Sequence, residues 1–345
     1  MPSTSPPDGI RRRLLRSRDW TRSQAPGLLA TGIVALAATF LSDHYGASPM
    51  LFALLLGMAV NFLSQEGPCV PGIALASGRL LRVGVALLGM RITFAQVAEF
   101  GWTPLVIGVV AVVGTILAGL AGARLFGFNR QFGLLSGGAV GICGASAALA
   151  IAAVLPHHEK KDRAVIFTVI SVSTLSTVAM VLYPILAQAL HLDPRLTGIF
   201  LGATIHDVAQ VVGAGYGVSD QAGDAATVAK LLRVVMLLPV LLVVSLVVRA
   251  NSTERAGAAP LLPAFALVFA LLVVLNSALP VPAQIRGAAN EISRWCLVIA
   301  ISAIGMKTQL KDLAAVGVRP VVMIVGETLF LMVLVVALMA LMPPM

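Results

Sequence analysis

Charged residues are scarce in this sequence. Only 11% of its 345 residues are Asp, Glu, Lys or Arg, whereas 58% are hydrophobic and the mean hydropathy is +0.95. A typical soluble domain carries about 25% charged residues, so the composition excludes a water-soluble fold. Apolar stretches of about 20 residues, enough to cross a bilayer, recur along almost the whole chain. We therefore expect an all-α, polytopic membrane protein.

Cysteine is also scarce, and the usual enzyme motifs are missing. The three cysteines, Cys69, Cys143 and Cys296, show no CxxC spacing and cannot all pair, so they predict neither a zinc knuckle nor a redox pair. The sequence contains no HExxH, GxxxxGK or GxSxG motif. An intramembrane aspartyl protease needs two facing Asp residues, but Asp207 is the only Asp at the centre of a span. We expect no enzyme activity and no cofactor.

One cluster of metal-ligand residue types is present, but it does not predict a metal site. His157, His158 and Glu159 lie together in a short charged loop. Adjacent histidines in such a loop are more often solvated than bound to a metal. We therefore expect no metal.

Basic residues outnumber acidic ones by 24 to 15, and the excess lies at the N-terminus. An apolar span follows directly, so anionic lipid and membrane topology explain this charge better than nucleic acid does. We expect residues 1–25 to form a disordered, basic cytoplasmic arm and no nucleic acid to bind. The arm's six arginines are Arg11, Arg12, Arg13, Arg16, Arg18 and Arg22.

Eleven stretches are apolar enough to be membrane spans, which predicts a single transmembrane domain over residues 26–345. With the N-terminus in the cytoplasm and the C-terminus outside, most loop Lys and Arg residues face inward, as the positive-inside rule requires. The predicted spans are residues 26–42, 48–64, 77–93, 101–123, 131–155, 163–189, 195–217, 224–249, 261–279, 290–306 and 317–342.

An internal repeat is visible when the chain is aligned with itself. Residues 89–91 (Gly-Met-Arg) match 305–307 (Gly-Met-Lys), and in the same register Gly101 and Pro104 match Gly317 and Pro320. Asn61 and Asn276 match after a shift of one residue. The copies lie an odd number of spans apart, which predicts inverted repeats, about 48–190 and 195–342, as in many secondary transporters. A recurring helix-end pattern is the alternative explanation.

The fifth span is rich in glycine, which disfavours a continuous helix. Gly137, Gly138, Gly141 and Gly144 fall within eight residues, and each costs up to about 1 kcal/mol relative to Ala in a helix. Unwound backbone in a membrane persists where protein or a watery cavity satisfies it, and a half-helix starting there attracts an anion. The four glycines, Cys143 and Ser146 are therefore candidate substrate-binding residues. Close helix packing through Gly137 and Gly141 is the alternative.

The seventh span carries ionisable residues near its centre. His206 and Asp207 would need a partner or a wet cavity there, because a charge at the bilayer centre costs at least about 2.5 kcal/mol. We expect Asp207 to carry coupling protons and His206 to sense pH or bind the anion, with Thr204 and Gln210 as further binding residues. Neutral hydrogen bonding between helices would be the structural alternative.

Three other charged residues within spans are candidate functional residues. Lys230 and Arg233, one turn apart, are candidates to balance the charge of an anion or of Asp207, although both could instead extend to the membrane interface. Glu327 is a candidate coupling or structural residue.

Three motifs resemble a known family. Residues 141–147 (GICGASA), residues 171–177 (SVSTLST) with Pro184, and residues 202–210 (GATIHDVAQ) are similar to the YeiH-type family of bacterial inner-membrane proteins, often labelled sulfate exporters. Residues 89–184 also resemble the bile acid/sodium symporter superfamily. That resemblance implies inverted five-helix repeats, with panel and core parts and two unwound helices that cross at the site. The chain departs from this pattern by an eleventh span and by its second Gly-rich segment preceding residue 305.

These observations favour a secondary transporter of a small anion in the bacterial inner membrane, working by alternating access. Sulfate, a related sulfur oxyanion or an organic anion would be the substrate, and outward transport is the expected direction. Its expected partners are the lipid bilayer and a coupling proton or sodium ion, and a homodimer is compatible with the sequence. A membrane sensor or scaffold without transport is the alternative, and an intramembrane enzyme is less well supported.

Overall fold

Helices account for all of the regular secondary structure that the computed structural model describes. It describes residues 8–46, 48–99, 101–156, 161–251, 264–309 and 317–341, and within these ranges there is no strand. The expected all-α fold is thus confirmed for the described residues. His157, His158 and Glu159 lie outside the described residues, and no metal-binding cluster is found among those that are described.

Six of the described helices are long and apolar enough to cross a membrane. They coincide with six of the eleven predicted spans, while shorter or more polar helices cover the other five, so the number of eleven crossings stays a prediction. The six segments are Arg22–Tyr45, Val70–Met90, Thr103–Leu125, Lys161–Ala189, Asp220–Val247 and Val318–Leu341.

The chain forms two compact units, each described here by itself. Unit 1 comprises Met1–Gly84 with Arg294–Thr308, and unit 2 comprises Val85–Ser293 with Gln309–Met345. The helices of unit 1 are α1 (Asp8–Tyr45), α2 (Pro49–Ala59), the 3-10 helix η1 (Asn61–Ser64), α3 (Val70–Leu75), the π-helix η2 (Ala76–Leu80), the start of α4 (Leu81–Leu87) and the end of α15 (Ala283–Lys307).

Unit 1 is built on close contacts between α1 and α3. The helix α1 begins at Asp8, so most of the arm that we expected to be disordered is helical. At Gly27, an added Cβ would collide with the backbone at Cys69 and Gly72, so the two helices meet where neither has a side chain. Ile73 and Ala76 then pack against Met306, which forms a small apolar core.

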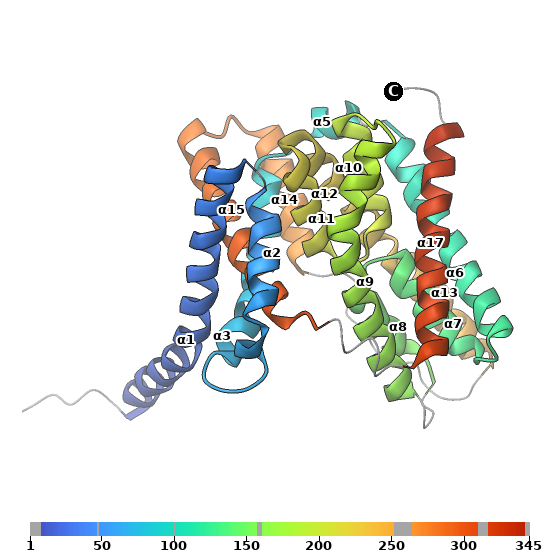
Figure 1. Ribbon diagram of the computed structural model, residues 1–345, viewed down its shortest axis with the longest axis horizontal. Helices are drawn as coiled ribbons and strands as arrows, with labels where there is room; N and C mark the ends of the chain where they lie inside the picture. Colours follow the sequence, from blue (N-terminus) through green and yellow to red (C-terminus); the bar gives the residue numbers. More distant parts are fainter. Residues whose placement is uncertain are drawn as a thin grey trace, which may run out of the picture. The chain divides into compact units, whose positions relative to one another are not determined.

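Unit 2 holds the remaining helices, and two pairs of them lie side by side: α6 with α7, and α10 with α12 (Figure 1). The elements are η3 (Leu88–Met90), α5 (Phe94–Glu99), α6 (Thr103–Leu125), α7 (Arg130–Gly141), α8 (Ala145–Val154), α9 (Lys161–Ala189), α10 (Pro194–Thr204), α11 (Val208–Val218), α12 (Asp220–Val235), α13 (Leu237–Asn251), α14 (Ala264–Ala278) and α17 (Val318–Leu341), with the start of α15.

The residues matched by the sequence repeat share a backbone conformation. Gly101 and Gly317 have positive φ angles of 63° and 99°, and each precedes a helix that carries a proline in its first turn, Pro104 in α6 and Pro320 in α17. Glycine adopts this left-handed region without the steric cost that a Cβ brings, and proline suits the first helical turn. The matched sequences therefore build the same helix start twice.

The repeat-related helix ends are also packed in a reciprocal way. In unit 2, Gly89 faces the backbone of Phe269 in α14, and Asn276 Nδ2 donates to the carbonyl of Ile92 at 3.2 Å. In unit 1, Gly305 faces the backbone of α2, and Asn61 Nδ2 donates to the carbonyl of Met306 at 3.0 Å. Each Gly-Met helix end thus packs against the apolar helix that belongs to the other sequence copy.

Candidate functional site

Both Gly-rich segments of unit 2 are interrupted in the structure. The first consists of α7 and α8, separated at Gly144, where φ is 64° and ψ is −129°, a conformation essentially restricted to glycine. The second consists of α10 and α11, separated at Ile205, His206 and Asp207. Each interruption frees the last carbonyls of one half-helix and the first N–H groups of the next, and these need partners in a membrane.

Lys230, on α12, satisfies carbonyls from both interruptions at once. Its Nζ donates to the carbonyl of Ile142 at 2.9 Å and to that of Ile205 at 2.8 Å. The side chain is fully buried, with 0% exposure. The two interrupted helices therefore meet at a single ammonium group, which also complements the negative ends of α7 and α10.

Arg233 lies one turn further along α12 and binds the same two half-helices. Its Nε donates to the carbonyl of Gly141 at 2.9 Å, and its Nη2 donates to that of Val140 at 2.8 Å. On the other side, its Nη1 donates to the carbonyl of Ala203 in α10. Like Lys230, it is fully buried, so neither side chain extends to a membrane interface. Both basic residues are engaged by backbone carbonyls, and their charges stabilise the helix breaks.

Small residues let α12 approach the interrupted helices closely enough for these contacts. A Cβ added at Gly202 of α10 would collide with the backbone of Ala226, and one at Gly215 of α11 would lie 2.9 Å from the Cβ of Ala226. With larger residues at these positions, α12 would lie further away and its two basic side chains would not reach the carbonyls.

Asp207 lies at the N-terminus of α8, across the first interruption. A Cβ at Gly144 would collide with its Oδ1, and its carboxylate is hydrogen-bonded to the backbone of Ala145 and to Ser173. Its own backbone N–H donates to the hydroxyl oxygen of Ser176 at 3.0 Å. The positive end of α8, where we expected an external anion, therefore faces a carboxylate of the chain itself.

His206 and Glu327 are both buried and hydrogen-bonded to other helices. The Nε2 atom of His206 lies 3.1 Å from Oγ1 of Thr328, and Ser136 Oγ donates to Oε1 of Glu327 at 2.8 Å. Glu327 and Thr328 are neighbours on α17, so this helix holds α7 on one side and the second interruption on the other. These are the hydrogen bonds between helices that the structural alternative for His206 required.

The other predicted binding residues have different surroundings. Gly137 packs against α6 at Thr115, and a Cβ at Gly141 would lie 3.3 Å from Cβ of the same threonine. Gly138 faces Ile151 of α8. These three glycines therefore serve close helix packing, which we had considered as the alternative for Gly137 and Gly141, and Gly144 alone among the four lies against Asp207.

Four predicted residues remain. Thr204 donates from Oγ1 to the carbonyl of Phe200 in its own helix at 2.6 Å. Cys143 is buried, and Ser146 is exposed in the first turn of α8. Gln210 is buried in α11, with Nε2 3.5 Å from Oγ1 of Thr177, while its Oε1 has no hydrogen-bond partner among the described residues. Ser146 and Gln210 therefore keep hydrogen-bonding groups available beside the interruptions.

Several polar contacts of the site were not predicted from the sequence. Ser173 and Ser176 of α9 contact Asp207, Thr177 of α9 contacts Gln210 in α11, and Thr328 contacts His206. The signal was present, because five hydroxyl side chains within the seven residues 171–177 of an apolar span are unusual. We used them only to recognise a family resemblance.

A second charged cluster in unit 2 lies at the junction of α11 and α12. Arg91 is 2.9 Å from Asp220 and 3.0 Å from Asp224, and its guanidinium lies over the ring of Tyr216. The Tyr216 hydroxyl donates to Asp224 at 2.6 Å. Burial disfavours the charged form of Arg91, but its hydrogen bond to Asp220 and the nearby acidic groups outweigh this, so the pKa of Arg91 is raised. The arginine thus remains charged and ties the end of η3 to α12.

Comparison with known proteins places the chain in a family. The family model described as Conserved hypothetical protein 698 matches residues 26–324. A UPF0324 membrane protein of Chlorobaculum tepidum is 57% identical over 90% of this chain and 87% of its own length. The UPF0324 membrane protein TauZ of Paracoccus denitrificans is 51% identical over 93% of this chain and 96% of its own length. No solved structure matches the chain significantly. The chain therefore belongs to the UPF0324 family of membrane proteins, in agreement with the YeiH-type resemblance of its motifs.

Proposed function

We propose that this protein is a secondary transporter that moves a small anion across the bacterial inner membrane by alternating access. One observation carries the proposal: two interrupted helices converge on Lys230, so the free carbonyl ends of α7 and α10 gather at one buried place. Continuous helices would cost less in lipid, and transporters use such interruptions to build binding sites near the bilayer midplane.

The proposed architecture is one transmembrane domain of eleven crossings with a cytoplasmic N-terminus. Two inverted repeats form its panel and core parts, and α7–α8 and α10–α11 are the crossing helices. The shared backbone at Gly101 and Gly317 and the reciprocal contacts of Asn61 and Asn276 support the repeats.

The substrate would bind at the start of α8, between Gly144 and Ser146. This is the positive end of a half-helix, which favours an anion. Because the Asp207 carboxylate lies against the same helix end, a substrate anion and a charged Asp207 would repel each other there. Protonation of Asp207 removes that repulsion, so proton uptake and anion binding favour each other. Ser146 and Gln210 supply further hydrogen-bonding groups.

The favoured substrates are small anions such as sulfate, a related sulfur oxyanion or an organic anion. A half-helix N-terminus recognises negative charge and hydrogen-bond acceptors, which all of these share. The negative interior of a bacterial cell drives anions outward, which favours export, whereas a co-transported proton would reduce that electrical drive.

The test is flux into and out of liposomes containing the purified protein. Labelled sulfate, sulfite and a panel of organic anions are supplied with and without a pH gradient, and at least one of them should show saturable flux that depends on pH. Absence of saturable flux for every anion, in both directions, would overturn the proposal.

Two variants test the role of Asp207. Asp207→Asn keeps the size of the side chain but holds no exchangeable charge, so its residual flux should no longer depend on pH. Asp43→Asn, an exposed acid at the end of α1, is the matched control and should retain the pH dependence. Unchanged pH dependence in Asp207→Asn would contradict proton coupling through this residue.

A further inference from the structure

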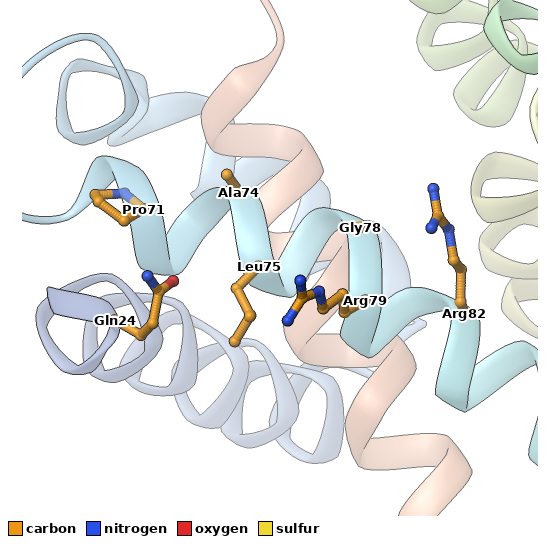
Figure 2. A pocket seen from close by; sticks show the side chains of 7 residues that line it. All are labelled: Gln24, Pro71, Ala74, Leu75, Gly78, Arg79 and Arg82. Atoms are coloured by element: carbon orange, nitrogen blue, oxygen red, sulfur yellow. The ribbon is translucent and has the colours of Figure 1, made fainter. Parts of the chain in front are cut away.

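A hollow on unit 1 is lined by two arginines that the proposed transport site does not use. It has a volume of about 300 Å³, at the lower end of the usual range for ligand pockets. Figure 2 shows Gln24 on one helix and the other lining residues along a second helix that runs from α3 through η2 into α4. The lining residues are Gln24, Pro71, Ala74, Leu75, Gly78, Arg79 and Arg82.

The two arginines carry concentrated positive charge into this hollow. Arg79 and Arg82 are three residues apart, so they lie on adjacent turns where like charges repel each other. Both side chains are exposed, and neither forms a salt bridge with a described acid of unit 1, such as Asp43 or Glu66. An anion between them would relieve the repulsion, and Arg22, two residues before Gln24 on α1, adds to the positive potential.

The backbone around Arg79 is also unusual. Residues Ala76–Leu80 form a π-helical turn, a rare feature that occurs often at functional sites. Gly78, within this turn, has no atom within 4 Å of the place where a Cβ would lie, so the hollow is open above its backbone. The wider turn and the missing side chain together leave room beside Arg79.

We propose that this hollow binds an oxyanionic group of the phosphate or sulfonate type, at a site separate from the helix interruptions. A guanidinium donates in pairs to such groups, and two guanidiniums on adjacent turns can share one group with three terminal oxygens. The Gln24 amide offers a further donor. The group belongs either to the headgroup of an anionic lipid or to a free small anion, and the proposal does not depend on transport activity.

Thermal unfolding of the purified full-length protein tests this site. One arm compares nanodiscs of phosphatidylcholine with nanodiscs that also contain phosphatidylglycerol, and the other adds sodium sulfate at constant ionic strength in phosphatidylcholine. Because a ligand that binds only the folded protein stabilises it, the unfolding midpoint should rise in at least one arm. A rise with phosphatidylglycerol alone identifies a lipid headgroup, and a rise with sulfate identifies a free anion.

Three variants separate this site from general charge effects. The double variant Arg79→Gln/Arg82→Gln should lose the rise, whereas Arg124→Gln/Arg130→Gln, which removes two exposed arginines from unit 2, should keep it. Gly78→Leu fills the hollow without changing charge and should also lose the rise, because nothing lies where its side chain begins. The proposal is overturned if neither arm raises the midpoint, or if Arg79→Gln/Arg82→Gln keeps the full rise.

Discussion

The Nε atom of Arg91 lies 3.0 Å from Oδ1 of Asp224, and this ion pair ties the end of η3 to α12. The residue that the sequence repeat matches with Arg91 is Lys307, whose Nζ donates to the Ser77 hydroxyl at 3.5 Å and forms no ion pair among the described residues. The two copies of the Gly-Met helix end therefore differ in charge pairing. In the alternating-access cycle that we propose, an ion pair at one end only would favour one of the two conformations.

Replacing Arg91 should show how much this ion pairing contributes to the stability of the fold. Arg91→Met removes two ion pairs and a cation–π contact, which together contribute about 1 to 2 kcal/mol for partly exposed groups. We expect a lower thermal midpoint, with a smaller difference from wild type at high salt because salt screens the pairs. Lys307→Met is the matched control and should change the midpoint little. Equal effects of the two substitutions would show that the pairing adds no stability.

Lys230 should be essential to the fold of unit 2. Lys230→Met keeps most of the side-chain volume but leaves the carbonyls of Ile142 and Ile205 without this donor, and each buried unsatisfied group costs about 1–3 kcal/mol. We therefore expect a loss of about 2–6 kcal/mol, measured as urea-induced unfolding in mild detergent. Lys161→Met removes a single bond, to the Leu155 carbonyl in a half-buried position, and should cost clearly less. Equal losses of stability in Lys230→Met and Lys161→Met would contradict the inference that Lys230 stabilises both interruptions.

The sequence predicted where the helices break but not what holds the breaks together. Glycine density in residues 137–144 and in residues 202–215 is a local signal, and both interruptions fall within these segments. The partners of Lys230 are 25 and 88 residues away along the chain, so only the tertiary fold brings them together. The sequence therefore offered Lys230 and Arg233 as candidates to balance the charge of an anion or of Asp207, and it did not predict their hydrogen bonds to backbone carbonyls.

Sequence reasoning also could not separate the roles of the four glycines in the fifth span. The sequence does not distinguish Gly137 from Gly144. In the structure, Gly137 packs against α6, whereas Gly144 adopts a backbone conformation that only glycine tolerates. Spacing of small residues predicts close packing as well as it predicts a break.

The sequence also did not predict that α1 begins at Asp8. A dense run of charge suggests disorder even when a helix continues through it.

Gly144 should tolerate no side chain. Gly144→Ala forces alanine into a backbone region essentially closed to it and places a Cβ against the Asp207 carboxylate. We expect a loss of about 2–4 kcal/mol from strain and contact combined. Gly127→Ala is the matched control: its φ is 75° and nothing lies within 4 Å, so it should cost only about 1–2 kcal/mol. Both losses are measured by denaturant unfolding.

A second substitution separates the two causes at Gly144. Asp207→Ala removes the carboxylate that a Cβ at residue 144 would meet, so the Gly144→Ala/Asp207→Ala double variant should lose less stability than the sum of the single variants. A strictly additive result would mean that backbone strain alone accounts for the Gly144→Ala loss.

If the two repeats share equivalent contacts, Asn61 and Asn276 should contribute similarly to the free energy of unfolding. Each donates to a backbone carbonyl at the end of a Gly-Met helix, Asn61 to Met306 and Asn276 to Ile92. Substitution by Ala removes this half-buried hydrogen bond in each case, at a cost of about 1 kcal/mol. Asn61 also loses a longer bond to the Thr308 carbonyl, at 3.4 Å, and an exposed one from Gln65, which add little. Since the two residues share no partner, the losses should add in the double variant. Thermal unfolding of the three variants checks this, with Asn129→Ala as a comparison, because Asn129 caps α7 outside the repeat-matched contacts. A negligible loss for one of Asn61→Ala and Asn276→Ala would show that the two contacts are not equivalent.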